Sequence, residues 1–97
     1  MAKYELKRPY PNESTANCYK AGISAAEKGG YKIFKKRELA WLAICKGNVG
    51  GSEVDLTLSI PFGGPTSVLL NLSSGSVDEA VLQSEAEKIF DLLEKEF

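Results

Sequence analysis

The stretch VDLTLSIPFGGPTSVLLNL, residues 54–72, decides the fold of this chain. Within residues 54–60 large apolar residues alternate with polar ones, which places an apolar and a polar row on opposite faces of a strand. The alternation returns at Val68, Leu70 and Leu72, with Leu69 on the other row. The intervening residues 61–65, Pro-Phe-Gly-Gly-Pro, break both patterns, because proline cannot donate a ladder hydrogen bond and glycine tolerates positive φ. The stretch predicts a β-hairpin with one face to bury.

The run just before this hairpin differs from its neighbours. Residues 39–45, LAWLAIC, predict a strand, and the glycine-rich residues 46–51 predict the turn into the hairpin. Both faces of this strand would be apolar, which is usual for a strand covered on both sides, and a buried helix is the competing interpretation. One face would hold Leu39, Trp41, Ala43 and Cys45, and the other Ala40, Leu42 and Ile44.

The chain before residue 39 predicts two strands and a helix. Residues 3–8 alternate apolar and charged side chains and should form a short edge strand that ends at Pro9. Asn12 or Ser14 can cap a helix that runs to about residue 28, where Gly29 and Gly30 stop it. Residues 31–36 predict the second strand, followed by a turn at 35–38.

A second helix is predicted after the hairpin. Ser76 and Glu79 fit a capping box, with Ser76 as N-cap, so the helix should run from Val77 to about Glu96. An apolar stripe at helical spacing follows this start. The stripe consists of Leu82, Ala86, Ile89, Phe90, Leu93 and Phe97.

These elements make one α+β domain that spans residues 1–97. The order β-α-β-β-β-β-α predicts an antiparallel sheet of about five strands with two helices on one face. This order resembles the β-α-β4-α unit of TATA-binding-protein-like domains and, in related form, of Bet v 1-like folds. The segment AEKGGYKI at residues 26–33, with FGGPTSV at 62–68, also resembles small uncharacterised bacterial domains of this topology. No functional motif of these families is matched, so the resemblance implies a fold and transfers no site residue.

Length and composition set the class of protein. The chain has 97 residues, 43% hydrophobic and 26% charged, as in an ordinary globular domain. No apolar run approaches the roughly 18 residues that a membrane span needs, so no membrane partner is expected. The N-terminus lacks the apolar region of a signal peptide, which predicts a cytoplasmic protein, although a chain trimmed of its leader would look the same.

The residue types in the chain give little support for a catalytic site. The chain has no histidine, which removes histidine-dependent nucleophilic arrangements and most zinc sites. Cys18 and Cys45 lie beside apolar neighbours, so we expect buried thiols, with a disulfide or reactive pair as the alternative. The glycine-rich loops at 47–51 and 62–65 join strand to strand and are expected to be turns, not phosphate cradles. We therefore expect no enzymatic activity, cofactor or metal.

Charge is distributed unevenly along the chain. Residues 1–50 hold ten lysines and arginines against four carboxylates, whereas residues 51–97 hold two against nine. A possible basic patch on the second strand and its turn consists of Lys32, Lys35, Lys36 and Arg37. With Phe34 and Trp41 nearby, this composition is that of a single-stranded nucleic-acid platform. The pI of about 5.5 is too low for a typical module of that kind, so nucleic-acid binding is expected to be weak.

The apolar excess of residues 39–45 favours a binding surface. Two helices on one face of a sheet leave the other face wet, so one apolar row would need a cover from the N-terminal strand, the loops or a partner. The candidate interface or ligand residues are Phe34, Trp41, Leu42 and Ile44. We expect a non-catalytic interaction module that forms a homo-oligomer through its sheet. The alternatives are a small apolar-ligand carrier, with a cavity between the last helix and the sheet, and a weak single-stranded nucleic-acid binder.

Overall fold

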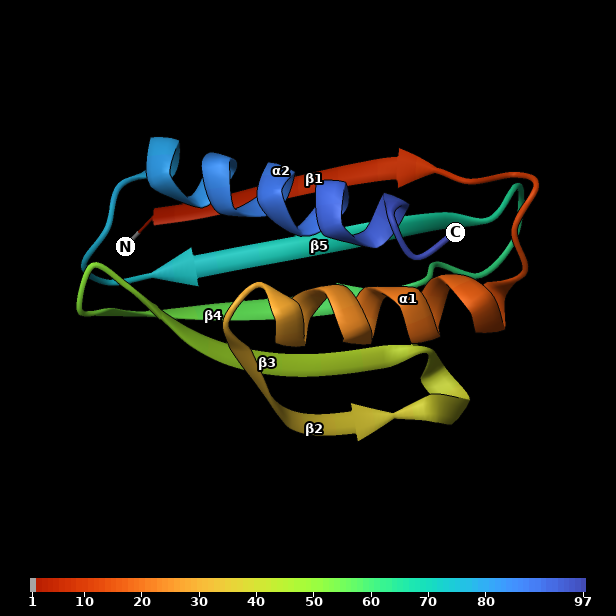
Figure 1. Ribbon diagram of the computed structural model, residues 1–97, viewed down its shortest axis with the longest axis horizontal. Coiled ribbons are helices and arrows are strands. Elements are labelled where there is room, and N and C mark those ends of the chain that lie inside the picture. The colour runs from red at the N-terminus through yellow and green to blue at the C-terminus, as the bar shows by residue number, and fades with distance from the viewer. Residues whose placement is uncertain (1) are drawn as a thin grey trace.

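The computed structural model describes residues 2–97 as a five-stranded sheet covered by two α-helices (Figure 1). The strands run in the spatial order β1-β5-β4-β3-β2, and each pairs antiparallel with its neighbour. The α+β class and the element order predicted from the sequence are confirmed, including the edge position of the first strand. In chain order the elements are β1 (Ala2–Pro9), α1 (Thr15–Lys28), β2 (Tyr31–Arg37), the 3-10 helix η1 (Glu38–Ala40), β3 (Leu42–Val49), β4 (Ser52–Ser59), β5 (Ser67–Ser74) and α2 (Glu79–Glu94).

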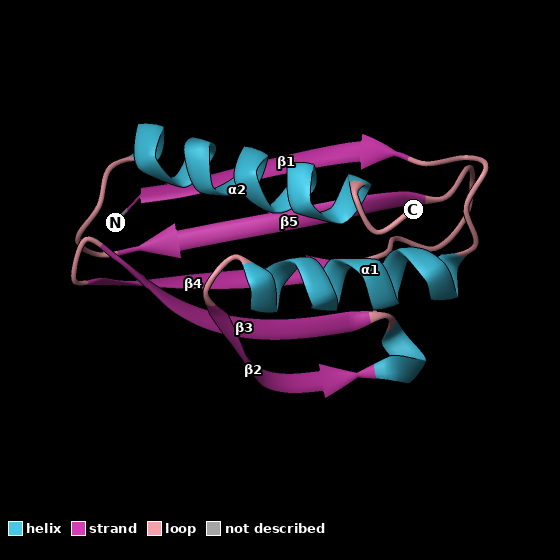
Figure 2. Cartoon of the chain, in the orientation of Figure 1, coloured by secondary structure: helices cyan, strands magenta, loops and turns pink. Residues whose placement is uncertain are grey.

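Both helices lie on the same face of the sheet. Figure 2 shows α2 in front of β1 and β5, and α1 in front of the β3 and β4 side. The side chains between the two layers form the core, whose largest fully buried members are Phe90, Leu56, Leu58, Ile60, Leu70, Leu72, Leu82, Ile89 and Leu93. No element among residues 2–97 lies on the opposite face.

The register of the central hairpin follows the alternation of its sequence. Leu58 pairs with Leu70, and Leu56 with Leu72, so the apolar rows of both strands meet on the helix side and are buried. Leu69 lies on the other row and is only half-buried. Burying one row of each strand removes its apolar surface from water, which makes a slip by one residue costly and fixes the register.

Helix α1 can lie close to the sheet because a glycine faces it. Ser14 is the N-cap, and its hydroxyl accepts a hydrogen bond from the backbone N–H of Asn17 at 3.1 Å. Gly29 ends the helix, as predicted. In the middle, Gly22 is buried against Leu58, and a Cβ at this glycine would lie 2.7 Å from Leu58 Cδ2. A larger residue at position 22 would therefore push the helix and the sheet apart.

The start of α2 differs from the prediction. Asp78, not Ser76, is the N-cap, and its carboxylate accepts a hydrogen bond from Val81 N–H at 3.0 Å. The Ser76 N–H instead donates to the hydroxyl of Ser74, which itself donates to the carbonyl of Glu53 at 2.8 Å. This turn ties the end of β5 to β4, so the helix begins two residues later than expected. The predicted apolar stripe is confirmed from Leu82 to Leu93.

The strand predicted at 39–45 begins only at Leu42. Residues 38–40 form η1, and Leu39 at its centre is 99% exposed. Trp41 follows in the left-handed region with φ 51° and ψ 49°, which an extended strand cannot contain. The prediction that Leu39 and Trp41 alternate on one strand face was wrong, because the chain turns a corner here before β3 starts. Ala43 and Cys45 do face the core, and Leu42 and Ile44 lie on the opposite face.

Candidate interaction surface

The face of the sheet opposite the helices, here called the open face, is the main surface of the described chain that no element covers. Strand pairing sets its rows: Leu69, Ser59 and Leu42 lie side by side in one, and Asn71, Thr57 and Ile44 in the next. These six side chains are half-buried and uncharged. The centre of the open face is thus a mildly apolar strip.

Charged residues frame this strip on both sides. On β2 the open-face positions are Lys32, Lys35 and Arg37, which pair in register with Lys46, Ile44 and Leu42 of β3. On β1 they are Lys3, Glu5 and Lys7. Two carboxylates of β4, Glu53 and Asp55, complete the frame. The open face therefore carries six cations and three carboxylates, whereas α2, on the opposite side of the molecule, carries five of the thirteen acidic residues.

The predicted basic patch is placed on an exposed edge strand. Lys32, Lys35, Lys36 and Arg37 are all exposed, but the structure divides them between two directions. Lys36 pairs with the core-facing Ala43 and so lies on the helix side of the edge, while the other three belong to the open face. The four cations therefore do not form one flat platform.

Phe34 lies at an irregular point of β2. The register shifts between Ile33 and Lys35, so Phe34 has no paired partner on β3. Its ring is 71% exposed, and Lys46 Nζ lies 5.2 Å from the ring centroid. Because Lys46 belongs to the open face, this cation–π contact places Phe34 at its rim.

Trp41 does not belong to the open face. Its ring packs edge-on against Tyr19 of α1 with centroids 5.5 Å apart, and the Tyr19 hydroxyl donates to the carbonyl of Leu42 at 2.8 Å. The helix side thus half-covers the tryptophan. Of the four candidate interface residues named from the sequence, Phe34, Leu42 and Ile44 are brought together on the open face, and Trp41 is separated from them.

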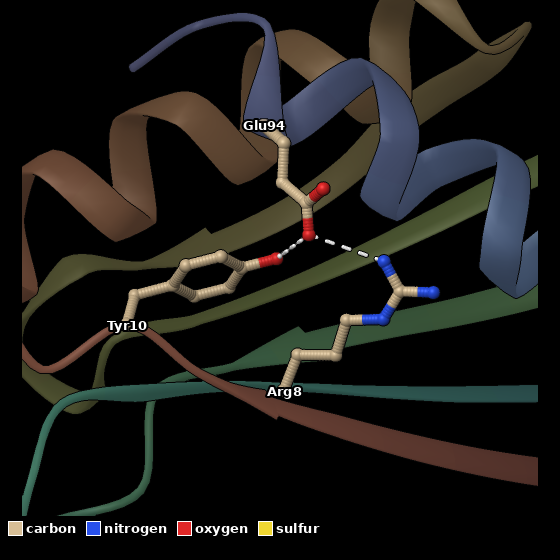
Figure 3. Close-up of polar contacts among 3 residues, drawn as sticks. All are labelled: Arg8, Tyr10 and Glu94. Carbon is tan, nitrogen blue, oxygen red and sulfur yellow. Dashed lines mark hydrogen bonds and ion pairs between the residues drawn. The ribbon is translucent and has the colours of Figure 1, made fainter.

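A polar cluster at the end of α2 serves the contact between the two layers. Glu94 Oε2 accepts hydrogen bonds from Tyr10 Oη at 2.7 Å and from Arg8 Nη1 at 3.1 Å (Figure 3). The Tyr10 hydroxyl and the guanidinium hold the pKa of Glu94 below its usual range, and burial raises the pKa of Tyr10. Arg8 also lies 4.9 Å from the ring centroid of Phe90. Every charged or polar group in this cluster has a partner within it, so it joins β1 to α2 and presents no free nucleophile.

A second polar cluster joins α2 to the beginning of β2. Glu85 Oε1 accepts a hydrogen bond from Tyr31 Oη at 2.9 Å, and Lys88 Nζ lies 2.9 Å from the same oxygen. Lys88 also donates to the carbonyl of Gly29 at 3.1 Å. The sequence did not reveal either cluster, because each joins residues of α2 to residues more than 50 positions earlier, and these meet only in the folded chain.

The cysteines are arranged as inert core residues. Cys18 and Cys45 are free thiols with no exposed surface. Burial raises the pKa of both, that of Cys45 to about 11, so the nucleophilic thiolate is disfavoured. Within residues 2–97 no group of three or more cysteine, histidine, aspartate or glutamate side chains could hold a metal ion. No helix in this part of the chain is long and apolar enough to cross a membrane.

Two of the hollows on the surface of residues 2–97 have their walls outside the core between α2 and the sheet. One, about 430 Å³, lies between α1 and the C-terminus and has Lys20, Ser24 and Glu96 on its walls. The other, about 560 Å³, is an open hollow lined by residues 36–40 around η1. The side chains at the centre of the core, Leu56, Ile89 and Phe90 among them, are fully buried.

Comparison with known proteins supports the fold. No protein-family model matches the chain, and no curated protein matches it. A crystal structure from Thermus thermophilus, that of TTHA0849, is similar with a TM-score of 0.60 and 11% sequence identity, over 98% of this chain and 94% of the other. At this identity the likeness concerns the arrangement of the backbone, which agrees with a small α+β domain.

Proposed function

We propose that this chain is a non-catalytic interaction module that self-associates through the open face of its sheet. The observation that carries the proposal is the position of Leu42 and Ile44, two branched aliphatic side chains side by side on a face that no element of residues 2–97 covers. Removing them from water would contribute about 25 cal/mol for each Å² of apolar surface buried. A second copy of the chain is the partner that we propose.

The edges of the sheet favour a contact through the face. β2 exposes lysines along its length and is interrupted by the irregularity at Phe34, and β1 has Lys3, Lys7 and Pro9. Lysine, proline and bulges on edge strands hinder the addition of another strand. Self-association by pairing of edge strands is therefore disfavoured, and packing face to face is the simpler route.

A two-fold axis parallel to β3 gives a contact with complementary charges. Such an axis stacks Leu42 and Ile44 of one copy on Leu42 and Ile44 of the other. It places β2 of one copy over β4 of the other, and each row of side chains across the sheet faces the same row of the second copy. Because Lys32, Lys46 and Asp55 share one row, Lys32 of one copy would face Asp55 of the other. Lys46 would approach its own copy near the axis, flanked by the two Asp55 carboxylates.

The experiment compares two aspartate substitutions on the same face. In this arrangement β5 extends beyond the partner, so Leu69 stays outside the contact although it is half-buried like Leu42. Leu42→Asp should convert the oligomer to a monomer in size-exclusion chromatography with light scattering, and Leu69→Asp should leave it intact. The wild-type protein should be oligomeric at about 100 µM, a concentration that populates any dimer with a dissociation constant well below that value.

A charge exchange tests the register. Asp55→Lys should weaken the dimer, because Lys32 would then face another lysine, and adding Lys32→Asp to the same chain should restore it. Strictly monomeric wild-type protein at about 100 µM would refute self-association. Equal loss of the dimer with Leu42→Asp and Leu69→Asp would refute this geometry.

Weak binding of single-stranded nucleic acid is the second candidate. The observation that favours it is the exposed ring of Phe34 at the rim of the open face, which contacts Lys46 and lies on the same strand as Lys32 and Lys35. Because so few cations can release few counterions, binding should be weak and be lost near physiological ionic strength. Fluorescence anisotropy with a labelled oligothymidylate tests this, and sub-micromolar affinity at about 150 mM salt would contradict it.

The carrier hypothesis rests on the resemblance of element order to Bet v 1-like folds, and the TATA-binding-protein-like alternative has the same basis. The side chains between α2 and the sheet, among them Leu56, Ile89 and Phe90, are fully buried and fill the place that an apolar ligand would need, so we prefer the interaction module. As part of this proposal, we place the protein in the cytoplasm.

A further inference from the structure

Two exposed apolar tips lie at the same end of the sheet. One is η1, where Leu39 is 99% exposed, and the other is the loop at 60–66, where Phe62 is 76% exposed. The pairing of Leu42 with Ser59 brings the roots of both turns together, and Figure 1 shows η1 and the β4–β5 loop at the same end of the long axis. The tips belong to different hairpins, so their shared position is a product of the fold.

A backbone hydrogen bond joins the roots of the two tips. Ile60 N–H donates to the carbonyl of Trp41 at 3.0 Å, which joins the residue after η1 to the residue that opens the second loop. Trp41 is the one non-glycine residue with positive φ in the described chain, and its ring is anchored on Tyr19. A conformation of this kind is strained for a residue other than glycine and persists only where the surroundings impose it. The tertiary structure therefore imposes the corner that exposes Leu39.

Cations stand directly behind the apolar tip of η1. Lys35, Lys36 and Arg37 precede it and are exposed, and Glu38 is the one acidic residue in this stretch. The open hollow of about 560 Å³ around the turn is lined by residues 36–40, so it combines cationic and apolar walls. An exposed leucine next to three cations fits an interface that is apolar inside and anionic at its surface.

We propose that this end of the molecule docks on the surface of an anionic lipid bilayer. Leu39 and Phe62 enter the boundary between headgroups and acyl chains, while Lys35, Lys36 and Arg37 contact lipid phosphates. The absence of a membrane-spanning helix in residues 2–97 is compatible with such peripheral binding, because docking needs only the tips. A deformable bilayer can surround two separate protruding side chains without the continuous complementary surface that a protein partner must provide.

Vesicle co-sedimentation tests the proposal. The wild-type protein should bind vesicles of phosphatidylcholine with phosphatidylserine and should not bind vesicles of phosphatidylcholine alone. The double variant Leu39→Ser/Phe62→Ser should lower the partition coefficient at least roughly tenfold, the effect of withholding one large apolar side chain from the bilayer. Phe34→Ser is the matched control, since it removes an equally exposed ring at another place and should leave binding unchanged.

A second pair of variants tests the charges. Lys36→Glu/Arg37→Glu should abolish binding to the anionic vesicles, whereas Lys3→Glu, an exposed cation at the start of β1, should not. Binding of the wild-type protein should weaken between about 0.1 M and about 0.5 M salt, because surface charges are then screened. All these positions are exposed, so the variants should keep the thermal stability of the parent.

The outcomes separate this proposal from self-association. Leu42→Asp should remain able to bind the vesicles, since Leu42 lies on the open face and not at the tips. No binding to the anionic vesicles, or binding that is unchanged in Leu39→Ser/Phe62→Ser, would overturn the proposal. Dissociation of an oligomer by this double variant, without vesicle binding by the wild type, would also overturn it and assign the tips to a second copy of the chain.

Discussion

The contact between Gly22 and Leu58 predicts that the effect of Gly22→Ala on stability depends on which residue occupies position 58. Leu58 is fully buried in β4, and α1 crosses it at a residue without a side chain. Leu58→Ala removes three buried carbons, worth about 0.8 kcal/mol each in transfer free energy. The cavity left behind adds to this, because no side chain of Gly22 can fill it. The free energy of unfolding should fall by about 3–4 kcal/mol, within the range known for such truncations.

Gly22→Ala places a methyl group where Leu58 already lies. The new Cβ would be 2.7 Å from Leu58 Cδ2 and 2.9 Å from Cδ1, so the leucine or the helix must shift. Overpacking of this kind costs about 1–3 kcal/mol, and the better helix propensity of alanine returns about 1 kcal/mol. In the parent chain the substitution should therefore be neutral or destabilising by up to about 2 kcal/mol.

In the Leu58→Ala background the same substitution should stabilise. The clash is gone, the helix propensity remains, and the methyl group fills part of the cavity, so Gly22→Ala should gain about 1–2 kcal/mol. Urea unfolding of the parent, both single variants and the double variant, at one protein concentration, gives the coupling energy. Leu69→Ala serves as the control for leucine truncation, because this half-buried side chain on the open face should cost far less than Leu58. Equal effects of Gly22→Ala in both backgrounds, or equal costs at Leu58 and Leu69, would refute the packing described above.

Three further outcomes follow from single side chains. Cys18 and Cys45 should react with a mild alkylating reagent only on unfolding, because burial raises the pKa of both thiols, and rapid labelling of the native protein would contradict this. The hydrogen bond from Tyr10 lowers the pKa of Glu94, so the stability that Glu94 contributes is present above its unfolded pKa and is lost as pH falls through the folded pKa. The stability difference between wild type and Glu94→Gln in urea unfolding should therefore shrink from about pH 7 to about pH 3, and a constant difference would refute the assignment. Trp41→Ala should lower the thermal midpoint and leave the oligomeric state unchanged, since its ring packs on Tyr19 inside one chain; light scattering that showed a monomer would place Trp41 in the contact instead.

Local pattern was enough to predict the sheet and the helices. Alternation in residues 54–72 placed the apolar row of each strand correctly, because the period of two in the sequence is the period of side chains in a strand. The end of α1 at Gly29, and its start at one of two cap candidates, Asn12 or Ser14, followed from chemistry that operates within a few residues, and the structure has Ser14 as the N-cap. The same reasoning predicts that one of the two apolar rows at 39–45 lacks a cover, but it leaves open which one, and only the structure places Leu42 and Ile44 on the open face.

The tertiary structure decided what depended on distant residues. Residues 39–41 have the composition of a strand, but Tyr19 and the Ile60 N–H, 22 and 19 positions away from Trp41, hold the chain in a corner there and expose Leu39. At the start of α2 both Ser76 and Asp78 are residue types that cap helices. The Ser74 hydroxyl donates to the Glu53 carbonyl and accepts from the Ser76 N–H, which holds Ser76 in the turn before the helix, and Asp78 is the N-cap. Sequence by itself determined the elements whose signals lie within a few residues. Where the local sequence allowed more than one turn or helix cap, contacts that form only when the sheet assembles decided between them. The same contacts decided which apolar side chains are exposed at the surface.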